Sequence, residues 1–418
     1  MLKKLIILFF VAVFCLRAQS KILIYMDLSQ TDHLRAYGIT YNTINNGEKA
    51  DWLLNYRGGS FILNYSEKTA AECRIEGVAF DAISASQAAE IYSLVQSEDQ
   101  NMEVMHLEKA PKIAVYVPPG FQPWDDAVTM ALEYAKVPYT KIWNDEILRG
   151  DLEKYDWLHL HHEDFTGQYG KFYASFSGAQ WYIDQQIRYE NDAKKNGFRK
   201  VSEMMRSVAF SIKDFIGRGG FLFAMCSATD SYDIALAAKN VDICDRMFDG
   251  DAEDPDAQSK LDFSQTLAFQ NFKLELNPYV YEYSDIDVQQ AEIGSQSNDY
   301  FTLFDFSAKY DPVPTMLTQD HANVIKGFMG QTTMFHKKLI KKSVIILGER
   351  EGLDQVRYIT GNYGRGTFTF YGGHDPEDYQ HLVGDPPTDL SLYKNSPGYR
   401  LILNNILFPA ATKKKQKT

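Results

Sequence analysis

The sequence predicts an α/β protein in which a mostly parallel sheet carries helices on both faces. Short apolar runs typical of strands alternate with segments of helical spacing through most of the chain, which is the pattern of a parallel sheet. Late strands separated by glycine turns predict an antiparallel extension. With 418 residues, 45% of them hydrophobic, the chain is long enough for two domains, or for one domain with large insertions.

The N-terminus has the pattern of a secretory signal peptide. Lys3 and Lys4 give a positive start, Leu5 to Leu16 are almost wholly apolar, and a small residue precedes the expected cleavage point. This apolar run is too short to span a bilayer. We therefore expect residues 1–18 to be removed and the protein to be periplasmic or secreted. Lipid attachment at Cys15 is the alternative.

Two similar strand–loop–helix openings divide the rest of the chain. Residues 19–110 are expected to form a smaller N-terminal α/β unit, beginning with a strand at Lys21 to Met26 and a helix at Thr31 to Tyr37. The main unit, residues 111–409, begins with a strand at Lys112 to Val117. Because both openings share a Lys-Ile-x-x-Tyr start, the two units could be a degenerate pair.

The main unit is predicted to continue as alternating strands and helices. The expected elements are a helix at 125–135, strands at 137–143 and 157–160, a helix at 201–216, a strand at 221–225, a helix at 231–239, strands at 343–347, 356–360 and 367–371, and a closing helix at 399–407. Insertions near 165–200 and 245–331 interrupt this order, and a basic tail at 410–418 ends the chain.

Cys226 is the first candidate for chemistry, because it follows a buried strand at the point where a helix begins. Open α/β sheets place their sites at this carboxyl edge, and a helix N-terminus lowers the pKa of a thiol. Ala224, Ser227 and Ala228 supply the small neighbours that a tight strand–helix elbow needs. The alternative is a structural cysteine that behaves as a small buried hydrophobe.

His374 is the second candidate. It leaves the strand Thr367 to Tyr371 in the run Gly-Gly-His-Asp-Pro-Glu, with Asp375 and Glu377 close behind. Histidine can activate a thiol, and a carboxylate can orient the imidazole. The alternative is a glycine-rich turn with a polar cap.

Together these motifs resemble the class I glutamine amidotransferase superfamily over residues 112–409. The run Gly373 to Glu377, followed by Pro397 to Arg400 and a final helix, is similar to the trehalose-utilisation-type branch. The elbow Ala224 to Ala228 is similar to that of the intracellular-protease and deglycase-like branch. The resemblance implies a flavodoxin-like, mostly parallel sheet with helices on both faces.

The resemblance also implies a cysteine-dependent hydrolase of a small amide, glycan or peptide. In that family the elbow cysteine is the nucleophile, which places Cys226 in this role, and His374 would be the general base. Either Glu377 or Asp375 would be the acid that orients the imidazole.

Departures from the family pattern favour a second hypothesis, a non-catalytic binding or scaffold protein on the same fold. Ala224 and Ala228 stand where glutaminases have glycine. Asp230 stands where they have glutamine, and Asp375 interrupts the His-Pro-Glu run. Chains of this type can carry the name asparagine synthetase B, but this sequence does not have the motifs of that family. The N-terminal cysteine that the family needs is missing, and Arg57-Gly58-Gly59-Ser60 lacks the acid of a pyrophosphate loop.

A run of polar residues, His159 to Asp164, closes one of the predicted strands. Alternation puts His159 and His161 on one face and His162 on the other. Two imidazoles and a carboxylate could hold zinc if a further ligand arrives. Because this strand end is expected beside the elbow, we interpret the residues as pocket lining, with no metal ion or cofactor assigned. The predicted pocket residues are His161, His162, Glu163, Ser227 and Asp230.

Composition limits the partners. A net charge of -12 argues against nucleic acid, and no later segment has the roughly twenty apolar residues of a membrane helix. A small molecule or glycan is the expected ligand, and aromatics between Phe172 and Tyr182 could contact a sugar or cover a core edge. The acidic loop Asp249 to Asp256 lacks features of a calcium loop and is expected to be solvated. The oligomeric state is left open.

Outside the signal peptide the chain has three cysteines, Cys73, Cys226 and Cys244. An oxidising compartment favours pairing, and an odd number leaves one thiol over. A disulfide between Cys226 and Cys244 would remove the proposed nucleophile.

Overall fold

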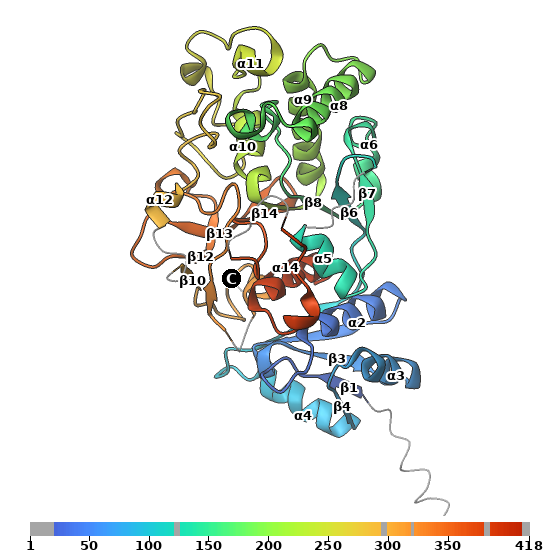
Figure 1. The fold of residues 1–418 in the computed structure, drawn as a ribbon. Coiled ribbons are helices and arrows are strands. Elements are labelled where there is room, and N and C mark those ends of the chain that lie inside the picture. Colours follow the sequence, from blue (N-terminus) through green and yellow to red (C-terminus); the bar gives the residue numbers. More distant parts are fainter. Residues whose placement is uncertain (1–20, 121–125, 294–298, 319–321, 380–384, 412–418) are drawn as a thin grey trace, which may run out of the picture.

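The computed structural model describes residues 21–120, 126–293, 299–318, 322–379 and 385–411. Within these residues the chain is a mixed α/β protein whose strands form two sheets (Figure 1). The predicted signal peptide and the tail beyond Ala411 lie outside the described residues. As far as the chain is described, none of its helices combines the length and the apolar character that crossing a bilayer requires.

The first sheet belongs to the N-terminal unit and has the strand order β4-β1-β3-β2-β5. Its strands are β1 (Lys21–Ile24), β2 (Ala50–Leu54), β3 (Ser60–Asn64), β4 (Asp81–Ile83) and β5 (Glu103–Leu107). Its helices are α2 (His33–Asn45), α3 (Glu67–Glu76) and α4 (Ala85–Gln96). The described strand pairs are antiparallel. The expected strand and helix are present as β1 and α2, but this unit does not repeat the topology of the main sheet.

The main sheet has the strand order β11-β10-β12-β13-β14-β9-β8-β6-β7. Strands from β14 to β7 pair in parallel, and strands from β11 to β14 pair antiparallel. The bounds are β6 (Ile113–Tyr116), β7 (Thr140–Ile142), β8 (Trp157–Leu160), β9 (Phe221–Met225), β10 (Tyr300–Leu303), β11 (Val324–Lys326), β12 (Ile345–Glu349), β13 (Val356–Tyr363) and β14 (Gly366–Tyr371). The prediction of a parallel sheet with an antiparallel extension is confirmed.

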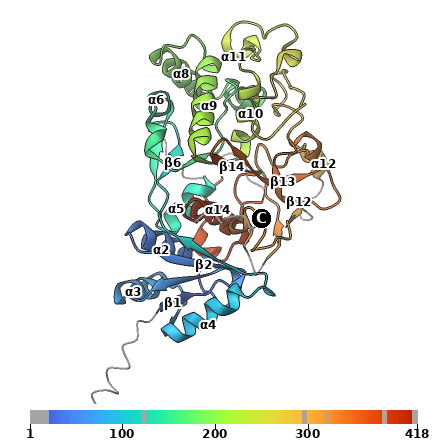
Figure 2. The same cartoon turned by 180° about the vertical axis from the view of Figure 1, so that it is seen from behind.

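Helices cover both faces of the main sheet, as Figures 1 and 2 show from opposite sides. One face carries α9 (Val201–Arg218) and α10 (Asp230–Ala237), and the other carries α5 (Ala127–Tyr134) and α14 (Pro397–Leu407). Successive residues of a strand point to opposite faces. Accordingly, Trp157 of β8 packs in the core that contains α5 and α14, and Leu158 packs in the core that contains α9 and α10.

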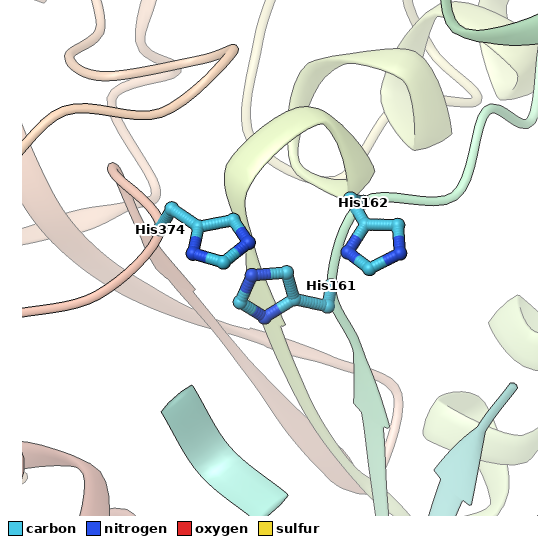
Figure 3. A group of neighbouring side chains, drawn as sticks. All are labelled: His161, His162 and His374. Atoms are coloured by element: carbon cyan, nitrogen blue, oxygen red, sulfur yellow. The ribbon is translucent and has the colours of Figure 1, made fainter. Parts of the chain in front are cut away.

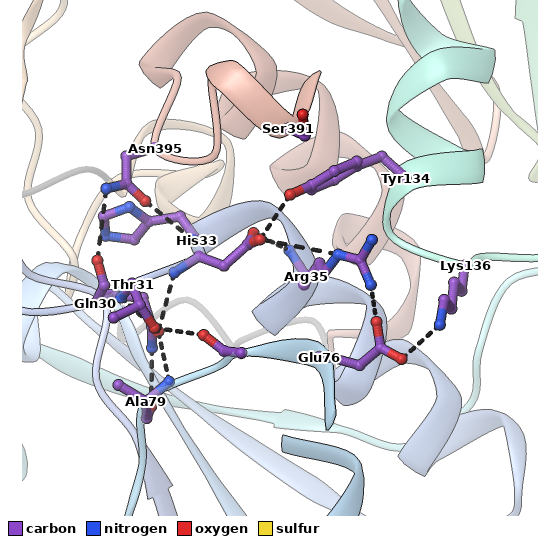
Figure 4. Close-up of polar contacts among 12 residues, drawn as sticks. Gln30, Thr31, His33, Arg35, Glu76, Ala79, Tyr134, Lys136, Ser391 and Asn395 are labelled. Carbon is purple, nitrogen blue, oxygen red and sulfur yellow. Dashed lines mark hydrogen bonds and ion pairs between the residues drawn. The ribbon is translucent and has the colours of Figure 1, made fainter. Parts of the chain in front are cut away.

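The helix α2 joins the two units by packing against α5 and α14. Gly38 of α2 permits this contact, because a Cβ there would lie 1.8 Å from the carbonyl oxygen of Ala135. Polar contacts surround the joint (Figure 4): the Tyr134 hydroxyl donates to Asp32 over 2.7 Å, and Lys136 pairs with Glu76.

The two predicted insertions differ in their structure. The first contains α7 (Tyr173–Phe176) and α8 (Gln180–Lys195). In the second, the helices of the described residues are short, namely α11 (Arg246–Asp249), α12 (Gln290–Ile293) and α13 (Pro314–Leu317), and the edge strands β10 and β11 also belong to it. The sequence did not predict α8. Only Tyr182, Tyr189 and Ala193 of this helix are buried, so its apolar stripe is too narrow to stand out among polar residues.

Candidate functional site

The carboxyl ends of β6, β8, β9 and β14 meet at one edge of the main sheet, because these strands are parallel neighbours. The structure brings Cys226 and His374, 148 positions apart in the sequence numbering, to adjacent strand ends at this edge. The backbone N–H of Cys226 donates to the carbonyl oxygen of Gly373 over 3.1 Å. The segment that carries the candidate nucleophile is thus hydrogen-bonded to the segment that carries the candidate base.

Cys226 occupies a strained elbow. Its φ is +49°, in the left-handed region that a residue with a side chain rarely adopts. It begins the short 3₁₀ turn Cys226–Ala228 between β9 and α10, and the N–H of Ala228 donates to the carbonyl of His161 over 3.0 Å. This contact ties the elbow to the loop after β8.

The sulfur of Cys226 is enclosed. The side chain is 2% exposed, and the backbone N–H of Gln331 donates to Sγ over 3.2 Å. Burial raises the pKa of the thiol to about 11, against the opposing effect of the N–H groups of Gln331, Thr332 and Ser227. The sequence reasoning expected the helix N-terminus to lower this pKa, but burial outweighs that effect. The resting side chain is therefore a neutral thiol at pH 7.

In the part of the chain that the structure describes, Cys73, Cys226 and Cys244 are all free and buried. The disulfide between Cys226 and Cys244 that the sequence left open is not formed. The thiol of Cys244 instead donates to the carbonyl oxygen of Thr166 over 3.3 Å.

Three imidazoles converge beside the elbow (Figure 3). The ring of His161 lies edge-on to that of His374, with the ring centroids 4.3 Å apart, and His162 lies 5.2 Å from His161 and 6.1 Å from His374 by the same measure. One ligand nitrogen from each residue lies within 4.8 Å of the others. The strand β8 ends at Leu160, so alternation does not hold His162 on an opposite face, and it joins the group.

The three histidines of the cluster differ in their exposure to solvent. His161 and His374 are buried, whereas His162 is exposed. A small molecule approaching from solvent would therefore meet His162 first.

Asp126 supports the cluster from the loop after β6. Its Oδ1 accepts the N–H groups of Val128 and Thr129 as the N-cap of α5. Its Oδ2 lies 2.9 Å from Nε2 of His159 and 3.6 Å from Nδ1 of His161. Asp126 was not selected from the sequence, although an aspartate at the start of a predicted helix is a recognisable capping pattern. One carboxylate thus joins a helix cap to two histidines.

Both ring nitrogens of His159 face oxygen atoms. Its Nδ1 lies 3.0 Å from the carbonyl oxygen of Phe223, which can only accept, and its Nε2 faces Asp126. His159 therefore fixes the position of Asp126 beside His161.

The two acids expected to orient His374 are directed to other partners. Asp375 accepts the Tyr399 hydroxyl over 2.7 Å and the N–H of Glu377 over 2.9 Å. Glu377 accepts the Tyr379 hydroxyl over 2.8 Å. Burial raises the pKa of both carboxyl groups. These contacts anchor the His374 loop to α14.

The other predicted pocket residues are buried beneath the elbow. Glu163 accepts the backbone N–H of His161 over 2.9 Å, and Ser227 is fully buried. Asp230 accepts the hydroxyl of Thr332 over 2.8 Å, and burial raises its pKa to about 7. These residues support the loops of the site from inside.

A segment that the sequence reasoning missed, Gly330 to Thr333, covers the elbow. Gly330 passes so close to the His374 loop that a Cβ on Gly330 would lie 2.8 Å from the backbone nitrogen of His374. The side-chain amide of Gln331 donates to the carbonyl of Gly170 over 2.7 Å. This segment lies at the end of the second predicted insertion. The sequence there has no periodic pattern that would have predicted the contact with the elbow.

Two further groups noted in the sequence lie in the insertions. The ammonium of Lys200 lies among Asp242, Asp249 and Asp251, so this lysine pairs with two carboxylates of the acidic loop and one before it. Phe172 contacts Trp181 and Tyr281 ring to ring, and the latter two rings are partly exposed.

No known protein family matches the chain, and no curated protein does. Two solved structures from Salmonella typhimurium, Cytoplasmic Protein STM1381 of strain LT2 and Cytoplasmic Protein STM3548, are similar at 12% and 9% identity, with TM-scores of 0.38 and 0.36. Each comparison covers 72% of this chain and 100% of that chain. Gan42B, a GH42 β-galactosidase, is similar at 10% identity with a TM-score of 0.28, over 64% of this chain and 28% of that chain.

The predicted periplasmic or secreted location is contradicted by this comparison, because both Salmonella proteins are named as cytoplasmic. The prediction came from a short apolar run after two lysines. Such a pattern of composition does not by itself fix a location.

Proposed function

We propose that the main unit has the flavodoxin-like fold of the class I glutamine amidotransferase-like superfamily. Numbered along the chain, its parallel strands lie in the order 2-1-3-4-5, which is the flavodoxin-like order. The left-handed elbow at Cys226 and the closing helix α14 after the His374 loop support the same assignment. In this order the topological switch point lies between β6 and β8, where open α/β sheets bind their ligands.

On this fold we propose a hydrolase whose reaction centre is the imidazole cluster with Asp126. The observation that carries the proposal is that His161 and His374, from two different strand ends, face each other beside the carboxylate of Asp126 at the start of α5. A carboxylate at one ring nitrogen orients an imidazole and leaves the other nitrogen to act as a base. In His161 that other nitrogen is Nε2.

The reaction uses water as the nucleophile. The imidazole takes one proton from the water molecule, and the oxygen bonds to the carbonyl carbon of an amide or ester in a small molecule, glycan substituent or peptide. The bond to the leaving group then breaks, and the imidazolium returns the proton to that group. No oxidant or second substrate is needed.

The test is hydrolysis of a panel of small amides, acetylated sugars and dipeptides by the purified chain and by His161→Ala. We expect a loss of roughly 10²-fold or more, which is the usual contribution of a general base. His106→Ala is the matched control, because His106 is an exposed histidine of the first sheet that pairs with Asp51. Turnover that survives His161→Ala would overturn the proposal, and binding without turnover would leave the non-catalytic hypothesis.

The cysteine-dependent hydrolase remains a second candidate, favoured by the positive φ of Cys226. In that mechanism the thiol attacks the carbonyl and His374 takes its proton. Cys226→Ser separates the two candidates. Activity that survives the change supports the imidazole centre, and activity that vanishes while the fold is retained supports the thiol.

A further inference from the structure

We infer that His161, His162 and His374 bind one divalent transition-metal ion, of which Zn²⁺ is the simplest case. The reaction that the ion would serve rests on the proposed function, whereas binding itself can be measured without turnover. Neutral imidazoles suit zinc and its neighbours, while calcium and magnesium prefer oxygen ligands.

The spacing of the nitrogens fits such an ion. A tetrahedral zinc with bonds of about 2.0–2.1 Å to nitrogen separates its ligand atoms by about 3.3 Å. The three nitrogens already lie within 4.8 Å of one another. Small ring rotations, chiefly of the exposed His162, complete the convergence.

The orientation of His161 is set for this role. Its Nδ1 lies 3.6 Å from Oδ2 of Asp126, which is close enough for charge attraction but longer than a hydrogen bond, and Nε2 lies on the side of His374. Figure 3 shows a ring nitrogen of His161 and one of His374 turned toward each other, with a nitrogen of His162 directed to the same space. A metal-binding histidine that donates its other N–H to a carboxylate is the usual second layer of a zinc site.

A neighbouring group of possible ligands, Asp126, His159 and His161, fits an ion less well. Nδ1 of His159 faces the Phe223 carbonyl and its Nε2 pairs with Asp126, so both nitrogens are engaged, and all three residues are buried. This group supports the cluster from behind. The exposed side, at His162, is left for a fourth ligand.

A site with three protein ligands and one open position is the arrangement of catalytic zinc, in which the bound water has a pKa of about 7. With the ion held by His161, His162 and His374, Nε2 of His161 would be a ligand instead of the base, and the ion would lower the pKa of the attacking water. The oxygen of that water would bond to the carbonyl carbon, and its proton would go to the leaving group as the bond to that group breaks.

The test measures ion binding by the full chain. The protein is stripped with a chelator, dialysed, and titrated with Zn²⁺ by calorimetry and with Co²⁺ by visible absorption. We expect one ion per chain and an intense Co²⁺ spectrum typical of four-coordinate nitrogen ligands. His374→Ala and His162→Ala should lose the spectrum, and Asp126→Asn, which keeps a capping oxygen for α5, should weaken binding by roughly 10- to 100-fold.

Two controls keep the result interpretable. His162 is exposed, so His162→Ala is expected to fold even if a buried variant does not, and His106→Ala should bind as the parent does. Binding that is equal in the parent, His162→Ala and His374→Ala overturns the inference. One bound ion without any hydrolysis defeats the proposed function alone. Hydrolysis by a parent protein that binds no ion in either titration defeats the metal site alone.

Discussion

His33 lies at the joint between the two units, and its Nε2 faces the carbonyl oxygens of Met26 and Asp27 at 2.7 and 3.0 Å. Carbonyl oxygens only accept, so this ring is a fixed donor in a polar network, and burial lowers its pKa to about 4. His161 and His374 are also buried, but each presents its ring to another imidazole. A nitrogen of each of these two rings is turned toward the other ring, so we propose chemistry at the cluster and not at the joint.

The largest change in the free energy of unfolding is expected from substitution of Arg400, the buried cation of the joint. Its guanidinium donates to the carbonyl oxygens of Met26 and Gly58 over 3.2 and 2.6 Å. Arg400→Met removes the guanidinium donor from the Gly58 carbonyl and leaves the Met26 carbonyl with the ring of His33, so we expect a loss of about 3 kcal/mol in the free energy of unfolding. Urea denaturation measures it. A loss below about 1 kcal/mol would mean that the joint does not hold the units together.

Acid should weaken the joint through His33. Because burial lowers its pKa from 6.5 to about 4, the unfolded chain binds a proton there between these values while the folded chain does not. The stability from this group is complete above pH 6.5 and falls as the pH drops toward 4, by about 3 kcal/mol in all.

The check is the urea midpoint at several pH values between 7 and 4, for the parent and for His33→Gln. The variant lacks the titrating ring, so its midpoint should fall less steeply over this range. Parallel curves for the two proteins would show that His33 is not the group responsible.

The parts of the fold that the sequence predicted are those set by local pattern. The bounds of β8 and β9 agree with the prediction, because each is a continuous apolar run closed by polar residues or a turn. The elbow at Cys226 was likewise visible as a strand that meets a helix among small residues. Local sequence pattern could not predict which segments, distant in the sequence, pack against one another.

The missed parts of the site depend on contacts between distant segments. Asp126 joins the cluster only because β6 lies beside β8, and Gln331 reaches the Cys226 sulfur across 105 positions. The pKa of Cys226 was predicted in the wrong direction for the same reason. A helix N-terminus can be found in the sequence near the thiol, but the covering segment that buries it cannot.

The enclosure of Cys226 predicts slow alkylation. With the pKa of the thiol raised to about 11, the reactive thiolate is a small fraction at pH 7, about 100-fold or more below that of a free cysteine. Mass spectrometry of the native protein after iodoacetamide treatment between pH 6 and 9 measures the rate. Fast labelling of Cys226 at pH 6 to 7, slowed by His374→Ala, would favour the thiol mechanism over the imidazole centre.

The smallest change in stability is expected for His162→Ala, although the same substitution should have a large effect on metal binding. His162 is exposed, so His162→Ala should change the free energy of unfolding by no more than about 0.5 kcal/mol, as surface substitutions usually do. The same change removes one of the three converging nitrogens and should abolish Co²⁺ binding. Urea denaturation and cobalt titration on one preparation measure both quantities. If His162→Ala were as destabilising as Arg400→Met, the cluster would be a second structural joint, and the contrast between the two regions would disappear.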